Sequence, residues 1–169
     1  MDVFDAIKKR RSVRRFKEKE VEEEKIAKIL DAFFWAPSAG NLQSRDIVVV
    51  KEKDLKEKLS KASFDQDFIR KSPVVFVVCA NKKKALPYGE RGTALYCLQD
   101  AAASVQNMLV VAYSLGLGSC WVGAFSEEQV GRVLGLPSFS RTVAIVPVGY
   151  PDENPASPRR ERIIHSEAW

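Results

Sequence analysis

The chain has 169 residues, a length typical of one domain. Its composition of 46% hydrophobic and 29% charged residues is that of a globular protein and excludes a disordered one. The net charge of +5 is concentrated in residues 8–19, where eight cations stand against Glu18 alone, and the balanced remainder excludes a general polyanion-binding surface.

The sequence indicates neither a membrane span nor a secretory signal. The longest apolar run, residues 73–80, is far too short to cross a bilayer. The first five residues include acids and no apolar stretch, so we expect a cytoplasmic protein. Three cysteines without a Cys-x-x-Cys pair, and His165 as the only histidine, argue against a disulfide framework and a zinc site.

The hydrophobic pattern predicts these elements in chain order: a short helix capped by Asp2 with Val3, Phe4 and Ile7 on one face, a helix over residues 21–35, a strand over 47–50, a helix over 53–62, a strand over 73–79, a helix over 93–115, an extended segment over 117–125, a helix over 127–134 and a strand over 142–148. The strand over 47–50 is a continuous apolar run, which predicts burial on both of its faces. Neither an internal repeat nor a domain boundary is visible, so we expect one domain.

The helix over 93–115 is rich in alanine and apolar on most sides. A helix that is apolar all round must be buried all round. One domain of this size rarely surrounds a helix of about six turns, so the pattern predicts a partner chain on its other face. Gly116 is placed to end the helix in the left-handed conformation.

Residues 151–169 differ in composition from the rest of the chain. Three prolines exclude regular structure there. The segment could be a frayed tail, but Ile163, Ile164 and Trp169 favour an arm that docks on another surface.

The chemistry-bearing residues gather first in a basic segment, Arg10-Arg11-Ser12-Val13-Arg14-Arg15-Phe16. Arginines beside a hydroxyl can bind a phosphate through charge-assisted hydrogen bonds. The same residues could equally form a solvated basic face or a nucleic-acid patch, although Phe16 is the only ring available there to stack bases. The usual phosphate loops are absent: there is no G-x-x-x-x-G-K-[ST], and Trp121 occupies the third glycine position of G-x-G-x-x-G.

Five stretches, taken in order, resemble the nitroreductase family and cover essentially the whole chain. They are Arg-Arg-Ser-x-Arg-x-Phe at 10–16, Ala-Pro-Ser-Ala-Gly-Asn-x-Gln at 36–43, the long helix from Arg91-Gly92 through Gln99-Asp100 and Gln106-Asn107, Gly-Leu-Gly-Ser-Cys-Trp-Val-Gly at 116–123, and Pro158-Arg159-Arg160 with Ile163-Ile164-His165. The resemblance implies an α+β fold of three layers, α/β/α, with a small, mainly antiparallel sheet flanked by helices. It also implies a single FMN-binding domain over 1–169 and a homodimer that exchanges its C-terminal arms, residues 151–169.

The resemblance further implies that FMN is held at the dimer interface. Arg10 and Ser12 would bind its phosphate or ribityl chain together with Arg159, and Arg11 would add a contact through its side chain or backbone. Arg14 would stand beside the pyrimidine edge, where a fixed positive charge stabilises the reduced flavin. The other implied contacts are Pro37, Ser38, Ala39 and Asn41 from the other chain, Val122 and Gly123 over the ring with a backbone N–H near N5, and Gln66 as a hydrogen-bond partner of the ring.

Three positions depart from the family pattern. Ser44-Arg45 stands where Pro-Trp is common, which changes the packing behind Asn41. Ser157 replaces a lysine and weakens one phosphate contact. The stretch from Asn81 to Gly92 is short, which predicts a more open site.

The predicted function is that of an FMN-dependent enzyme that uses NADH or NADPH to reduce nitroaromatics, quinones or related acceptors by a ping-pong route. No catalytic side chain and no metal are expected, because the flavin carries the chemistry. A flavin reductase or a flavin dehydrogenase with a narrow substrate range is the alternative within the same fold. The alternative outside enzymes is a basic, nucleic-acid-binding dimer that uses residues 8–19.

Overall fold

The computed structural model of the chain describes residues 2–156, 158 and 163–169. The helices are α1 (Val3–Lys9), α2 (Glu23–Phe34), α3 (Lys53–Ala62), α4 (Phe68–Lys71), α5 (Lys82–Ala85), α6 (Gly89–Arg91), α7 (Cys97–Ser114) and α8 (Glu127–Leu134), with short turns η1 (Ala39–Asn41), η2 (Leu86–Tyr88) and η3 (Gly92–Tyr96). The strands are β1 (Arg45–Val50), β2 (Val74–Asn81), β3 (Gly118–Ser119) and β4 (Ser140–Gly149).

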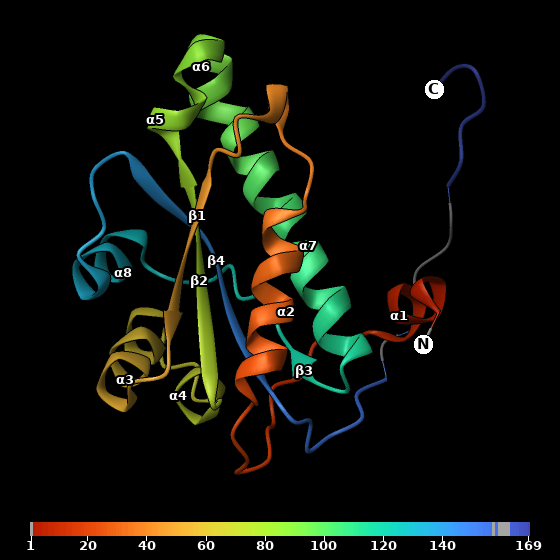
Figure 1. Cartoon of the computed structure of the whole chain (residues 1–169), viewed down its shortest axis with the longest axis vertical. Helices are drawn as coiled ribbons and strands as arrows, with labels where there is room; N and C mark the ends of the chain where they lie inside the picture. The colour runs from red at the N-terminus through yellow and green to blue at the C-terminus, as the bar shows by residue number, and fades with distance from the viewer. Residues whose placement is uncertain (1, 157, 159–162) are drawn as a thin grey trace.

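The strands form one sheet in the order β1-β2-β4-β3, and all three neighbouring pairs are antiparallel. α2 and α7 cover one face of this sheet, and α3, α4 and α8 cover the other (Figure 1). The arrangement confirms the predicted three-layer α+β fold with its small antiparallel sheet.

The central strand β2 explains why both faces need a helical layer. Its even-numbered side chains, such as Phe76, join the core under α2 and α7, whereas the odd-numbered ones, such as Val77, join the core under α3 and α8. Every residue of β2 is buried. Burial of each large apolar side chain contributes about 1.5–3 kcal/mol, so this strand holds the two layers together.

The predicted burial of the first strand on both faces is confirmed only in part: Ile47 packs against the core under α2 and α7, and Val48 and Val50 belong to the core under α3 and α8. β1 pairs only with β2 and lies at the edge of the sheet. Its residues Ile47 and Val48 are partly covered, and Val49 is 38% exposed. The continuous apolar run reflects β-branched residues suited to a strand, and it carries no information on which strands flank it.

The long helix α7 is shorter than predicted, because residues 92–96 form the π-helical turn η3 before it. The side chains that face the sheet and α2 are buried, whereas Ala102, Ala103 and Val110 are only partly covered. A partner chain over these three residues stays a prediction. Gly116 follows the helix with φ of +77°, which confirms its left-handed conformation.

The N-terminal helix α1 leaves its apolar face open in a single chain. Val3, Phe4 and Ile7 are 66%, 58% and 46% exposed. Asp2 occupies the N-cap position, but its side chain makes no capping bond, and only its backbone carbonyl accepts from Ala6. The predicted side-chain cap at Asp2 is therefore wrong.

The basic segment and the start of the C-terminal segment are bound to the sheet. Ser12 forms a parallel bridge with Ser119, and Phe16 forms an antiparallel bridge with Pro151. Further along, Ile163, Ile164 and Trp169 are 79–101% exposed. Among the described residues, the ring of His165 stacks on Trp169 at 4.6 Å between centroids, and all three apolar side chains stay largely open. Arm exchange stays a prediction.

Candidate functional site

Three of the predicted phosphate- and flavin-binding residues affect the buried thiol of Cys120. Burial raises the pKa of the Cys120 thiol. The charge of Arg14, a hydrogen bond involving Ser12 and the charge of Arg10 oppose that rise. The bridge between Ser12 and Ser119 fixes the segment beside the glycine-rich stretch that follows α7.

Arg11 points elsewhere. Its Nη1 donates to the carbonyls of Lys8 at 2.7 Å and Arg10 at 2.8 Å. The side chain lines a hollow of about 240 Å³ together with Lys9 and Tyr113. A phosphate contact through the side chain of Arg11 therefore gains no support, although its backbone stays beside that of Ser12.

Val122 and Gly123 end the extended segment in a way that leaves one amide without a partner. Val122 exchanges both backbone hydrogen bonds with Ile145, at 2.9 and 3.1 Å. The next amide, that of Gly123, meets no acceptor among the residues that the structure describes. A Cβ added at Gly123 would meet nothing within 4 Å, so open space lies beside its Cα, and the residue is exposed.

Gln66 supports the segment around Gly123 through hydrogen bonds, and its side-chain amide has no free N–H for a ligand. Its Nε2 donates to the carbonyls of Ser63 at 2.8 Å and Ala124 at 2.9 Å. Both N–H groups are thus in use, and only the side-chain carbonyl could contact a ligand. A contact between this side-chain carbonyl and the flavin ring stays a prediction.

The loop over residues 37–44 holds the other predicted contacts and lies at a different place in the chain. Pro37 and Asn41 are exposed, and Ser38 and Ala39 are partly covered. The loop follows α2 at the end of the molecule where α6 lies, whereas β3 and the basic segment lie near the opposite end of α7 (Figure 1).

A residue outside the predicted site anchors this loop. Asp100, on α7, is 4% exposed and accepts from Ala39 N at 2.9 Å. Ser44 adds two hydrogen bonds to the same carboxylate, from its Oγ at 2.6 Å and its N at 3.2 Å. An acid inside an otherwise apolar helix was the available signal, since a buried carboxylate requires polar partners.

The Ser44-Arg45 departure is explained by the same cluster. The Arg45 side chain is buried, and its Nη2 donates to the carbonyls of Phe34 at 2.9 Å and Ala36 at 2.8 Å. Burial lowers the pKa of Arg45, and the charge of Asp100 opposes that effect. Arg45 therefore fills the space behind Asn41 while it fastens the exit from α2.

Within one chain, α7 separates the loop from Gly123. The loop contacts α7 through Asp100, whereas Gly123 shares a hollow of about 370 Å³ with Leu98 and Ala102. Residues two positions apart on a helix point roughly 200° apart, so the two groups lie on opposite sides of α7. The predicted site is therefore not closed within a single chain.

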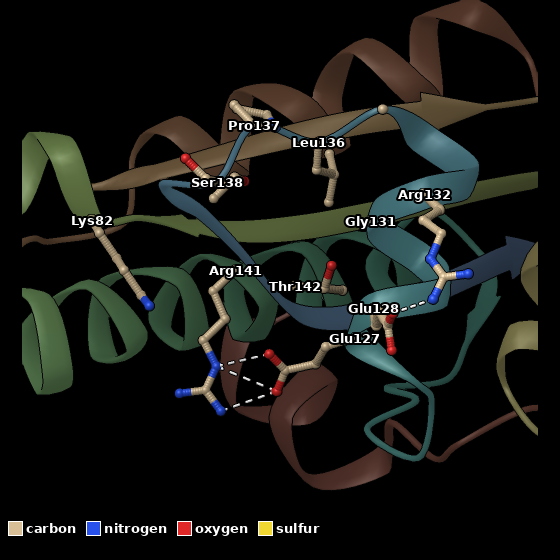
Figure 2. Close-up of a pocket in the computed structure, with 12 residues that line it drawn as sticks. Lys82, Glu127, Glu128, Gly131, Arg132, Leu136, Pro137, Ser138, Arg141 and Thr142 are labelled. Carbon is tan, nitrogen blue, oxygen red and sulfur yellow. Dashed lines mark hydrogen bonds and ion pairs between the residues drawn. The ribbon is translucent and has the colours of Figure 1, made fainter.

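A hollow of about 770 Å³ lies at α8 and the start of β4 (Figure 2). None of the predicted site residues lines it. Two of its cations are paired: Arg141 donates to Glu127 at 3.0–3.3 Å, and Arg132 contacts Glu128 (Figure 2). Its charges are thus largely compensated, and we do not regard it as the site.

The residues that the structure describes support neither a metal-binding cluster nor a membrane-spanning helix. No group of three or more His, Cys, Asp or Glu side chains among them could hold a metal ion. Within the same residues, no helix has the length and apolar character to cross a membrane.

Comparison with known proteins agrees on one family. The Nitroreductase family matches residues 7–66 and 63–150. A Thermus thermophilus protein named NADH dehydrogenase is 35% identical over 90% of this chain and 88% of its own length. The structure of an FMN-dependent nitroreductase from Clostridium difficile R20291 superposes with a TM-score of 0.84 at 28% identity, and covers 98% of this chain and 99% of its own. The structure of NADPH:FMN oxidoreductase from Vibrio harveyi, complexed with NAD+, has a TM-score of 0.90 at 26% identity and covers 99% of this chain and 77% of its own.

Proposed function

The chain belongs to the nitroreductase family, and on that premise we propose that it is an FMN-dependent oxidoreductase that uses NADH or NADPH to reduce small acceptors such as nitroaromatics or quinones. The observation that carries the proposal is the unpartnered amide of Gly123, with open space beside the Cα of this residue, at the end of the segment that also holds Ser12 in place. Relatives named for FMN and for NADPH support the choice of cofactor and donor.

The residues present fit an FMN molecule. Arg10 and Ser12 supply the cation and hydroxyl that bind a phosphate. Arg14 supplies a positive charge for the pyrimidine edge, and Gly123 supplies a backbone donor without a side chain in the way. When bound at these residues, FMN would supply the two-electron chemistry between NAD(P)H and the acceptor, which we propose follows a ping-pong order, so that no side chain of the chain needs to act as acid or base.

We propose that the working unit is a homodimer. The loop with Pro37, Ser38, Ala39 and Asn41 lies across α7 from Gly123, so a second copy would have to bring this loop to the flavin. The open face of α1 and the partly covered residues of α7 supply apolar surface for such a contact. In the same dimer, the arm with Ile163 and Ile164 would dock on the partner. Arg159, the predicted phosphate contact on this arm, lies outside the described residues.

A flavin reductase is the second candidate, because the Vibrio harveyi neighbour bears the name NADPH:FMN oxidoreductase. The nucleic-acid alternative has no such support. Within residues 8–19, Lys9 pairs with Asp5, Arg15 with Asp152 and Lys19 with Glu22, so several of the cations already have acidic partners.

FMN titration tests the proposal. The purified protein is expected to quench FMN fluorescence and to elute as a dimer that retains the flavin. Steady-state rates with free flavin, a quinone and a nitroaromatic then separate the two enzyme candidates. A protein that leaves FMN fluorescence unchanged but binds DNA with a steep salt dependence would overturn the proposal.

A further inference from the structure

The loop over residues 37–44 has an unusual backbone. Gly40, Asn41 and Gln43 have φ of +53°, +56° and +49°. Non-glycine residues rarely adopt this left-handed conformation, and they keep it only where the surrounding structure holds them there. Asn41 and Gln43 are both exposed, so their own side chains are not packed in the interior. Bonds within the loop account for part of its conformation: the amide of Gln43 donates to Oγ of Ser38 at 3.0 Å, and its Nε2 donates to Oδ1 of Asn41 at 3.2 Å.

One buried carboxylate ties the loop to the rest of the protein. Oδ1 of Asp100 accepts from the amide of Ala39 at 2.9 Å, on one side of the three left-handed residues. Oδ2 accepts from the Oγ of Ser44 at 2.6 Å and from its amide at 3.2 Å, on the other side. A single side chain from α7 thus closes both ends of the loop.

Arg45 holds the chain just before this loop. Its buried Nη2 donates to the carbonyls of Phe34 and Ala36, where the chain leaves α2. Burial lowers the pKa of Arg45, and the charge of Asp100 opposes that effect. Asp100 and Arg45 therefore hold different parts of the segment between α2 and β1.

We propose that Asp100 is a positioning residue for the flavin site of the partner subunit. It holds residues 37–44 in the one conformation that presents Ser38, Ala39 and Asn41 outward. The inference rests on the proposed function, because it assumes that this loop reaches FMN. The new point is that Asp100 fixes the conformation of the loop of its own chain although it touches neither flavin nor substrate.

The test compares Asp100→Asn with Ser44→Ala. The asparagine keeps one oxygen but replaces the second by an amide, which cannot accept from Ser44. In the apoprotein, hydrogen exchange at the amides of Ala39 and Ser44 is expected to speed up while that of α7 stays slow. The Kd for FMN is expected to rise about tenfold in Asp100→Asn and by a smaller factor in Ser44→Ala. The midpoint potential of the bound flavin should stay unchanged, because Arg14 and Gly123 are untouched.

Asp31→Asn is the matched control. Asp31 is another helical carboxylate that accepts a hydrogen bond, from Nε1 of Trp35 at 3.1 Å, but it is exposed. Its replacement should leave the Kd for FMN unchanged. A folded Asp100→Asn protein with wild-type FMN affinity would overturn the positioning role. Where Asp100→Asn fails to fold, wild-type affinity in Ser44→Ala overturns it equally. A wild-type protein that binds no FMN would instead sink the proposed function, and the exchange pattern of the loop would not depend on that result.

Discussion

The backbone amide of Arg14 donates to Oε1 of Glu153 at 2.5 Å, and the amide of Arg15 donates to the same oxygen at 3.1 Å. This carboxylate holds the basic segment through backbone amides, so the contact does not depend on the arginine side chains. The guanidinium of Arg14 lies over the ring of Phe68, 5.8 Å from its centre. The side chain of Arg14 can therefore be removed without loss of the contact that places its backbone.

Arg14→Ala is expected to slow the reduction of bound FMN by NAD(P)H about tenfold or more, because a fixed cation no longer stabilises the developing negative charge. Anaerobic stopped-flow measurement of flavin absorbance checks the rate. Arg15→Ala removes the same charge from the next position, where the side chain bonds to the carbonyl of Asp152, and should react at the wild-type rate. Equal rates for Arg14→Ala and wild type would remove the assigned role of Arg14.

Gly40→Ala is expected to destabilise the protein by about 1–2 kcal/mol through its left-handed backbone, and further through contact with Tyr88. A Cβ at Gly40 would lie 2.4 Å from the Tyr88 hydroxyl. Gly116→Ala has a similar backbone cost at φ of +77° but meets nothing within 4 Å, so it isolates the backbone contribution. Urea unfolding should show that Gly40→Ala is less stable than Gly116→Ala. Combining each variant with Tyr88→Ala should reduce this difference in the free energy of unfolding. Equal stability of the two glycine variants would contradict the contact.

Glu22 is expected to make the stability depend on pH in the acid range. A hydrogen bond from its own backbone amide, followed by one from the Tyr150 hydroxyl, lowers the pKa of Glu22 from 4.5 to about 2. A depressed folded-state pKa contributes stability above the unfolded value, and this stability is lost as pH falls from 4.5 toward 2. Glu22→Gln should therefore be less stable than wild type at neutral pH and approach it near pH 2.

Urea unfolding of wild type and Glu22→Gln across this range measures the effect. Glu24→Gln removes the same charge from a nearby position on α2 and controls for net charge. A constant difference in the free energy of unfolding between Glu22→Gln and wild type at all pH values would refute the linkage.

The sequence predicted local structure well where periodicity carries the signal. The helix predicted over 53–62 has those bounds in the structure, because Leu55 and Leu59 recur at helical spacing and Glu52 caps the first turn. The edge position of β1 could not be predicted in this way, since strand order depends on pairings between distant segments. The Asp100 cluster was hidden for the same reason: its partners at 39, 44 and 45 are far away in the chain.

The flavin-site residues were predicted mainly from resemblance, and the structure adds to that prediction unevenly. The bridge between Ser12 and Ser119 places the basic segment beside the glycine-rich stretch, and the amide of Gly123 meets no acceptor among the described residues. The structure turns the Arg11 side chain away and occupies the Gln66 amide. These last two outcomes depend on side-chain direction, which a linear motif does not specify.

Mixed dimers are expected to show that the loop acts in the partner's site. One chain carries Arg10→Ala, and the other carries Asn41→Asp, which keeps a residue that tolerates the left-handed conformation but replaces an amide donor. Each homodimer has two impaired sites. The mixed dimer should have one intact site, and therefore regain half of the wild-type number of tight FMN sites per dimer. If the loop served its own chain, no tight site would return.

The central claim is that this chain passes electrons from a nicotinamide donor to an acceptor through bound FMN. Anaerobic mixing of the FMN-loaded protein with NADH or NADPH, followed by a quinone, tests it most directly. One donor is expected to bleach the flavin absorbance in the absence of acceptor, and the quinone should then restore it. Bound flavin that neither donor reduces would contradict the account.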